Sequence, residues 1–574
     1  MIVLGLSGAL GHDASAAILV DGKIIAAAEE ERFIRDKHAK NLFPYEAAKF
    51  CLKQAGIKAE EVDIVAFPYA EIQLSSNARW HYAKRHWYAP DRALDALFNG
   101  NRRFRRNRDK SLKLMADLGL TNAKFVPVEH HLAHASSAYH LSGFKEKTAI
   151  VGIDGKGEYA TTFFGYGENG VIHKIKEFYD PDSLGGMYGA ITEYLGFEML
   201  DGEFKVMGMA PYGDASKYDL SKLVTFENGD LRINTELVNV VGFRRYKENG
   251  RGHYFSPKLI EWLGPKRHGD EIDDPYIHYA AAVQKLLEDV ALKMIDYYLG
   301  DIIRETGRIA MAGGVALNVK LNQRIIAMPH VKELFVQPAS GDNGTSLGAA
   351  TYAANVVGDI IEPMQHAYLG PAYTSAECIV ACEAHPAKPT FTRVENAPQK
   401  AAELLASGNP LAWLQGRMEF GPRSLGCRSI LGDPSYPGVA DRINAQIKYR
   451  ERWRPFCPSI LDKFAEDILQ TNHPAPYMTF TFDVADKWKS RIPEVVHEDG
   501  TARAQVVTHA TNPRYYELIE HLEKLRGIPV VLNTSLNRRG EPMICSPTDA
   551  LNMFFGCDLE YLMMEDVLVT KVIA

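Results

Sequence analysis

Apolar runs and glycine turns alternate through the first thirty residues. The run IVLGLSGA begins at Ile2 and ends in small residues, and the runs AILV and KIIAAAE flank Asp21–Gly22. Apolar runs joined by Asp-Gly are typical of a β-hairpin. The pattern therefore predicts a strand, a polar loop that holds His12 and Asp13, and then a hairpin.

The same layout returns about 150 residues later, where TAIVGI leads into a DGKG loop and two further apolar runs. A long helical pattern over residues 276–305 follows, and then two strand–glycine–helix patterns, RIAMAGGVALN and LFVQPASGDNGTSLGAA. Two strand–loop–hairpin halves predict a duplicated α/β domain of the actin-like class. Two unrelated β-meanders are the alternative.

Proline and glycine punctuate residues 360–375, which indicates a linker. We therefore predict a first domain over residues 1–367 and a second over residues 368–574. In the second domain, arginines and a lysine lie beside glycines, prolines and apolar strands. Positive charges at strand ends suit a compact polyanion such as a nucleoside triphosphate. Surface arginines that only keep the protein soluble are the alternative.

Composition narrows the classes of partner. The 574 residues are 46% hydrophobic and 24% charged, as in ordinary globular proteins. A net charge of −7 gives no general affinity for nucleic acid. No apolar run approaches the roughly 18 residues of a membrane span, and the first residues lack the basic start of a secretory leader. We expect a cytoplasmic protein that binds neither nucleic acid nor membrane.

Four histidines gather in the segment VEHHLAHASSAYH. His130 and His134 are four residues apart, which puts them on one face of a helix. Two imidazoles on one face make half of a metal site, although an ordinary polar helix surface has the same spacing. A third ligand must come from elsewhere in the chain.

Nine segments in order resemble the O-carbamoyltransferases of antibiotic and nodulation-factor biosynthesis. The segments are GHDASAAILVDG, EEERFIRDKH, HHLAHASSAY, DGEFKVMGMAPYG, GGVALN, SGDNGTSLGAA, GRMEFGPRSLGCRSIL, KYRERWRPFCPSIL and VLNTSLN. The resemblance implies an actin-like domain similar to the tRNA threonylcarbamoyl transferase, followed by a YrdC-like α/β domain. It also implies a two-stage reaction. Carbamoyl phosphate and ATP give carbamoyl-adenylate, and the carbamoyl group then moves to a hydroxyl of a small-molecule acceptor.

The resemblance assigns roles to residues of the first domain. His12 matches the proposed proton acceptor, and an imidazole in a loop suits a general base. His130, His134 and Asp342 match a metal site whose implied ion is Fe(II), although spacing alone does not separate iron from zinc or manganese. Lys37 matches a position near the acceptor. The residues implied to line the adenylate cleft are Asp154, Gly155, Gly313, Gly314 and Asn318.

In the second domain the resemblance implies a site for carbamoyl phosphate and for ATP with its Mg²⁺. The residues implied to form it are Arg423, Lys448, Arg450, Arg454, Arg503, Asn533 and Ser535.

Three questions stay open at the level of the sequence. The segment Gln73–Asn107 is rich in Trp, Tyr, His and Arg, and it suits a pocket wall for a sugar or nucleoside as well as a packed helical insertion. The oligomeric state is undecided, with a homodimer as one alternative. A tRNA-modifying transferase and a non-catalytic actin-like ATPase are the competing functions.

Overall fold

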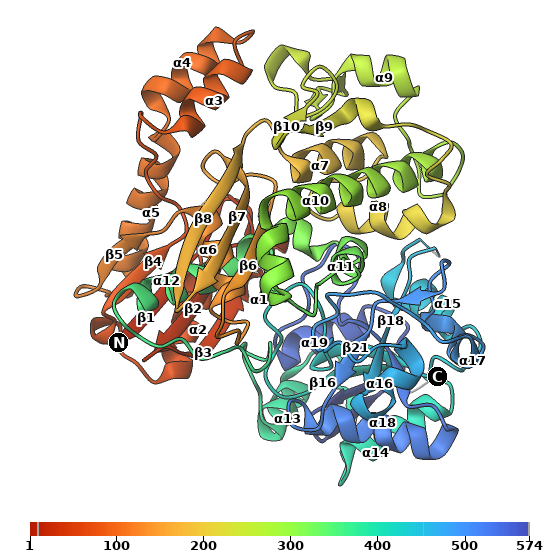
Figure 1. Ribbon diagram of the computed structural model, residues 1–574. Coiled ribbons are helices and arrows are strands. Elements are labelled where there is room, and N and C mark those ends of the chain that lie inside the picture. Colours follow the sequence, from red (N-terminus) through yellow and green to blue (C-terminus); the bar gives the residue numbers. More distant parts are fainter. Residues whose placement is uncertain (9–10, 452, 572–574) are drawn as a thin grey trace. The chain divides into compact units, whose positions relative to one another are not determined.

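The computed structural model describes residues 1–8, 11–451 and 453–571 (Figure 1). Its chain forms two compact units. The first unit contains residues 1–25 and 41–364, and the second contains residues 26–40 and 365–574. Residues 26–40 therefore belong to the second unit, although they come early in the sequence.

The first unit contains two five-stranded sheets with the same strand order, although residues 26–29 at the end of one edge strand are grouped with the second unit. One runs β3 (Lys23–Glu29), β2 (Ser15–Val20), β1 (Ile2–Leu6), β4 (Ile64–Phe67), β5 (Lys124–Pro127), and the other runs β8 (Val171–Tyr179), β7 (Ala160–Glu168), β6 (Thr148–Ile153), β13 (Arg308–Ala312), β14 (Glu333–Val336). In both sheets the central strand, β1 or β6, pairs antiparallel with the strand that follows it in sequence, β2 or β7. On its other side it pairs parallel with a later strand, β4 or β13. This repetition confirms the predicted duplicated α/β domain of the actin-like class.

Helix α12 (Thr345–Val356) packs closely against both β1 and α6 (His130–Tyr139). A Cβ atom on Gly5 of β1 would overlap the carbonyl oxygen of Ser346, and a Cβ atom on Gly348 would overlap that of Ala133 in α6. Both contacts bring backbone against backbone, so only glycine fits at these two positions. Strand β6 is buried along its whole length, which explains its continuous apolar run.

The segment Gln73–Asn107 is helical, as one of the two alternatives proposed. It contains α3 (Asn77–Arg85), α4 (Pro90–Asn99) and the start of α5 (Arg102–Leu118). Ala78, Tyr82 and Ala96 form a buried cluster with Tyr159. The other helices of the unit are α2 (Tyr45–Ala55), α7 (Leu184–Tyr194), α8 (Glu203–Met209), α9 (Pro257–Leu263), α10 (Tyr276–Thr306) and α11 (Val319–Ile326), and a short hairpin is formed by β9 (Val224–Glu227) and β10 (Asp230–Ile233).

The second unit is an α/β domain, as its resemblance to YrdC-like domains implies. Its eight-stranded mixed sheet runs β15 (Thr390–Arg393), β24 (Val567–Thr570), β23 (Tyr561–Met564), β16 (Leu411–Leu414), β17 (Arg428–Gly432), β22 (Val530–Ser535), β18 (Cys457–Leu461), β21 (Gln505–Val507). Trp413 of β16 is fully buried in a core that includes residues of α14 (Ala397–Ala406) and α18 (Pro513–Arg526). The other main helices are α13 (Ser375–Ala384), α16 (Asp462–Leu469) and α19 (Pro547–Phe555).

Within the described ranges, no helix combines the length and the hydropathy that crossing a bilayer would need.

The packing of α12 gives the first prediction. Gly348→Ala should lower the free energy of unfolding by about 1–3 kcal/mol, because the added methyl group has to displace the backbone of α6. Gly155→Ala is the matched control, since a Cβ atom there would have no neighbour within 4 Å. Denaturant unfolding of both variants measures the difference, and equal stabilities would contradict this view of the packing.

Candidate functional site

Two histidines and two aspartates converge in the first unit. His130 and His134 lie on α6, Asp154 follows β6 directly, and Asp342 begins a 3-10 turn after β14. The two Nε2 atoms are 3.1 Å apart. The His130 Nε2 atom lies 3.5 Å from a carboxylate oxygen of each aspartate, and the His134 Nε2 atom lies 3.9 Å from each. All four side chains are buried, and one ligand atom from each fits within 4.8 Å.

The chemistry of this cluster fits a divalent metal ion. Burial opposes a charge on His130, but Asp342 and Asp154 outweigh burial and raise the pKa of His130 well above its usual value. Burial and the charge of His130 lower the pKa of His134 to about 3. The carboxylates of Asp154 and Asp342 therefore favour positive charge at this place, which a bound cation would supply. Nitrogen and oxygen donors in this number are typical ligands of first-row divalent metals, and these residues do not distinguish one such metal from another.

Backbone contacts fix the ligands. Buried Glu158 accepts a hydrogen bond from the backbone N–H of His130 (3.1 Å) and thus caps the start of α6. Gly157 packs against this helix, since a Cβ atom there would lie 3.0 Å from Cβ of His130. Gly314 donates its backbone N–H to Oδ1 of Asp154 (2.9 Å). Gly313 has a φ of +94°, and a side chain there would overlap the backbone of Ile153.

Three of the predicted adenylate residues lie at the metal-ligand cluster. Asp154 is part of it, and Gly313 and Gly314 form the turn that donates to Asp154. Asn318 caps α11 by accepting from Leu321, and its amide exchanges two hydrogen bonds with Gln284. Gly155 faces open space. A role of these residues in binding adenylate stays a prediction.

His12 lies next to the cluster. Its Nδ1 atom is 3.0 Å from Oδ2 of Asp13, and its Nε2 atom is 3.7 Å from Oδ2 of Asp342. Burial disfavours the imidazolium, but Asp342 and Asp13 outweigh burial and raise the pKa of His12 to about 8. The side chain is 27% exposed, so solvent reaches it. Asp342 therefore joins His12 to the two histidines of α6.

A cavity of about 120 Å³ lies beside α6. Its wall includes His131 and Glu158 from the region of α6, Tyr179 from β8, and Ser76 and Ala78 from the start of α3. The cavity is several times larger than the roughly 10–15 Å³ that one water needs. The segment Gln73–Asn107 therefore both packs as helices and lines a pocket.

Five predicted cations gather in the second unit, and their pKa values show that they act on one another. Burial lowers the pKa of Arg423 well below its usual value, and Arg503 and Arg454 add to the effect. Burial, with Arg454, lowers the pKa of Arg450 to about 9. The pKa of Lys448 is also lowered well below its usual value by burial, and then by Arg450, Arg454 and Lys37. Like charges held together in a buried place repel one another, and a bound polyanion would relieve that repulsion.

The remaining predicted residues of the second domain support this cluster. The Lys448 ammonium donates to the Oγ atom of Ser535 (3.2 Å) and to the Oδ1 atom of Asn537 (2.8 Å). The Asn533 amide is buried and binds Ser424 through both its oxygen and its nitrogen. Lys37, which was predicted near the acceptor, belongs to the second unit and acts electrostatically on Lys448.

Three positions at these candidate sites were not assigned from the sequence. Asp154 was assigned to the nucleotide and not to the metal, although it lies, like Asp342, in a glycine-containing loop after a strand. Glu158 had no signal, because its partner is a backbone N–H distant in sequence. Glu419, fully buried, accepts N–H groups from Leu425 and Cys427 and so holds the loop that carries Arg423.

Comparison with known proteins matches both parts of the chain to one family. The carbamoyltransferase N-terminal family model covers residues 2–351, and the carbamoyltransferase C-terminal model covers residues 402–571. An uncharacterized protein of Synechocystis is 34% identical over 99% of this chain and 96% of its own length. Nodulation protein NolNO of Sinorhizobium fredii is 34% identical over 100% of this chain and 83% of its own length.

More distant similarities extend the comparison. Nodulation protein U of Rhizobium tropici is 25% identical over 92% of this chain and 90% of its own length. Among solved structures, full-length HypF in its phosphate- and nucleotide-bound form overlaps with 63% of this chain and 56% of its own, at 14% identity and a TM-score of 0.30.

The cluster predicts metal binding that depends on each ligand. His134→Ala, Asp154→Asn and Asp342→Ala should each lower metal affinity by more than about tenfold, because a ligand also orients its neighbours. His140→Ala, at the residue that follows the same helix, is the matched control and should keep the wild-type affinity. Metal analysis of the purified proteins checks this, and wild-type metal content in the three cluster variants would rule the site out.

Proposed function

The chain belongs to the carbamoyltransferase family, and on that premise we propose that it is an ATP-dependent O-carbamoyltransferase. The second unit would make carbamoyl-adenylate from carbamoyl phosphate and ATP with its Mg²⁺. The first unit would pass the carbamoyl group to a hydroxyl of a small-molecule natural product. We expect this chemistry in the cytoplasm, without nucleic acid or membrane as partner.

The adenylate half of the reaction needs cations around phosphate groups. Atom balance requires one water to release phosphate from carbamoyl phosphate and give carbamate. The carbamate oxygen then attacks the α-phosphorus of ATP, and pyrophosphate leaves. Lys448, Arg450 and Arg454 would hold the phosphates and stabilise the negative charge of the transition state.

The transfer half needs a base for the acceptor and a positive charge near the carbonyl. His12 would take the proton of the acceptor hydroxyl, whose oxygen then attacks the carbamoyl carbon while AMP leaves. Asp13, 3.0 Å from Nδ1, would hold the ring so that Nε2 faces the hydroxyl. His130, His134, Asp154 and Asp342 would hold the metal, and a divalent ion supplies Lewis-acid stabilisation of a carbonyl or phosphoryl oxygen.

The observation that carries the adenylate proposal is the grouping of cations in the second unit, where Lys448 is buried and Arg423, Arg450, Arg454 and Arg503 are half-buried. They lie close enough to lower the pKa values of Arg423, Lys448 and Arg450. A protein that only needs soluble arginines keeps them apart on its surface, where water screens their charges. Burying them together is unfavourable unless an anion of high charge binds among them. ATP and carbamoyl phosphate are such anions.

Two alternative functions have less support from the sequence and the site. A tRNA-modifying transferase would need a basic surface for its substrate, and this chain carries a net charge of −7. A non-catalytic ATPase would have no use for His12 beside a cluster of metal-type ligands.

The direct test is incubation with ATP, carbamoyl phosphate and a panel of hydroxylated metabolites. Mass spectrometry should find one acceptor that gains a single carbamoyl group, only when both co-substrates are present. Transfer to tRNA in place of a small molecule would favour the first alternative.

Lys448 and Arg450 should be needed for the first half-reaction alone. Lys448→Ala and Arg450→Ala should abolish carbamoyl-phosphate-dependent ATP–pyrophosphate exchange, because the charges that hold the phosphates are lost. Both variants should still transfer the carbamoyl group from added carbamoyl-adenylate. Lys463→Ala, at an exposed ion pair with Glu520, is the control. Exchange at the wild-type rate in both variants would contradict the assignment.

His12 should be needed for the second half-reaction alone. His12→Asn should leave pyrophosphate exchange unchanged and slow transfer by about 10²–10⁴-fold, which is the usual contribution of a positioned general base. Single-turnover transfer from preformed carbamoyl-adenylate measures this step. His330→Asn, at an exposed position, should behave as wild type. Equal transfer rates in wild type and His12→Asn would place the base elsewhere.

A further inference from the structure

We propose that the helical hairpin of α3 and α4 positions Asp154 in the metal-ligand cluster, with Asp182 as the positioning residue that connects them. The proposal rests on the metal centre proposed above. It assigns a role to the segment Gln73–Asn107, which the sequence left open.

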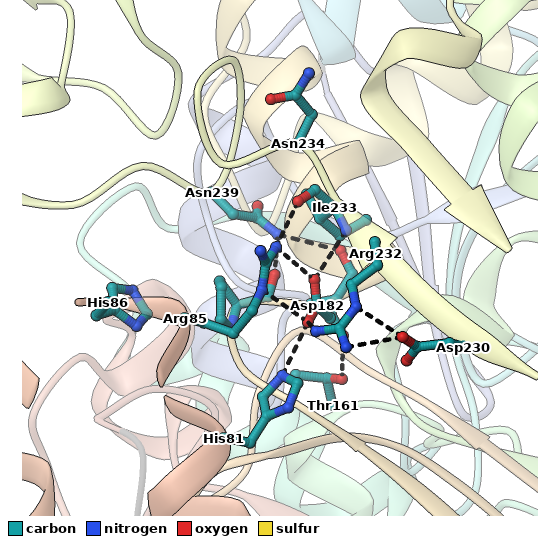
Figure 2. A network of polar contacts seen from close by, with 12 residues as sticks. His81, Arg85, His86, Thr161, Asp182, Asp230, Arg232, Ile233, Asn234 and Asn239 are labelled. Atoms are coloured by element: carbon teal, nitrogen blue, oxygen red, sulfur yellow. Dashed lines mark hydrogen bonds and ion pairs between the residues drawn. The ribbon is translucent and has the colours of Figure 1, made fainter. Parts of the chain in front are cut away.

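Asp182 is the centre of a buried polar network (Figure 2). Its side chain is 1% exposed. From α3, His81 lies 2.9 Å from Oδ2, and Arg85 donates to Oδ1 (2.8 Å) and Oδ2 (3.1 Å). From β10, the backbone N–H of Ile233 donates to Oδ1 (2.8 Å), and Arg85 also donates to the carbonyl oxygen of Ile233 (2.7 Å). The carboxylate of Asp182 thus connects both α3 and β10 to the segment that precedes α7.

The backbone around Asp182 holds the backbone of Asp154. The hydroxyl of Thr161 donates to the carbonyl oxygen of Asp182 (2.7 Å), and the carbonyl oxygen of Thr161 accepts the N–H of Asp154 (2.9 Å). The next residue, Ser183, donates its hydroxyl to the carbonyl oxygens of Gly155 (2.7 Å) and Asp154 (3.2 Å). Asp154 is therefore held on both sides by residues that are fixed to Asp182.

A second connection joins α3 to the same loop. The ammonium of Lys156, two residues after Asp154, forms an ion pair with Asp180 and lies 5.3 Å from the ring centroid of Tyr82 on α3. Tyr82 belongs to the buried cluster that packs the hairpin against Tyr159. Both connections start on α3 and end beside Asp154, so a shift of this helix changes where the carboxylate can lie.

The expected loss of metal affinity can be taken from residues that orient the ligands at other metal sites. Groups that orient a ligand without touching the metal change metal affinity by about 10–100-fold when mutated. Asp182 orients Asp154 through two short backbone links and is expected to fall in this range. A residue that only stabilises the fold would lower the unfolding temperature and leave the affinity of the folded protein unchanged.

The experiment is a titration of the full-length protein with Co²⁺, followed by visible absorption at a temperature well below unfolding. Asp182→Asn keeps the shape of the side chain but loses its charge, and it should weaken Co²⁺ binding about 10–100-fold. Arg85→Lys and His81→Gln change only α3 and should weaken binding in the same direction. These two variants decide the question if Asp182→Asn does not fold.

Glu193→Gln is the matched control. Glu193 is also a buried carboxylate of the first unit. It lies near the end of α7 opposite to Ser183, and it binds Arg251 (3.3 Å) and the backbone N–H of Tyr254 (2.7 Å). It should lower thermal stability without changing Co²⁺ affinity. Wild-type affinity in the Asp182 and α3 variants, with lowered melting temperatures, would overturn the proposal. Wild-type affinity in Asp342→Ala would instead show that the metal centre itself is wrong, and the present proposal would fall with it.

Discussion

The contact between α12 and α6 is the constraint on which the first unit depends. Gly348 lies against the carbonyl of Ala133 with no room for a methyl group, and Gly5 allows the same helix to lie equally close to β1. Asp342 lies in the turn that leads into α12, and His130 and His134 lie on α6. The glycine contacts therefore set the distance between a carboxylate and two imidazoles that are more than two hundred residues apart.

Both units hold charged side chains in sheltered places, and the two groups suit ligands of opposite sign. In the first unit, the carboxylates of Asp154 and Asp342 face the imidazoles of α6. Burial acts to raise the pKa of Asp154, but its histidine neighbours outweigh burial and hold that pKa well below its usual value. In the second unit, arginines and a lysine lower the pKa values of one another. Neither arrangement favours stability by itself. A bound cation in the first unit and a bound polyanion in the second would relieve the repulsion between like charges in each. These are the ligands that carbamoyl transfer and adenylate formation would bring.

Around both sites, many of the contacts that hold functional side chains use a backbone N–H group as one partner. Near the proposed metal centre, the Gly314 N–H donates to the Asp154 carboxylate, and Glu158 accepts the N–H that starts α6. In the second unit, Glu419 accepts N–H groups of the loop that carries Arg423. Sequence patterns suggested nucleotide contacts for the glycines, because glycine after a strand is compatible with a close phosphate as well as with a close carboxylate. The choice between those uses depends on which side chain lies opposite.

The sequence by itself determined the class and the order of the parts. Hairpin signals at Asp21–Gly22 and after the DGKG loop are local, so they predicted β2, β3, β7 and β8 and the duplication. The spacing of His130 and His134 is also local, and it fixed their shared face. Only the tertiary structure decided that Asp154 joins them, that residues 26–40 belong to the second unit, and that Asp182 collects donors from α3 and β10. Those contacts join residues far apart in the chain, and their partners are often backbone groups, which have no signature in the sequence.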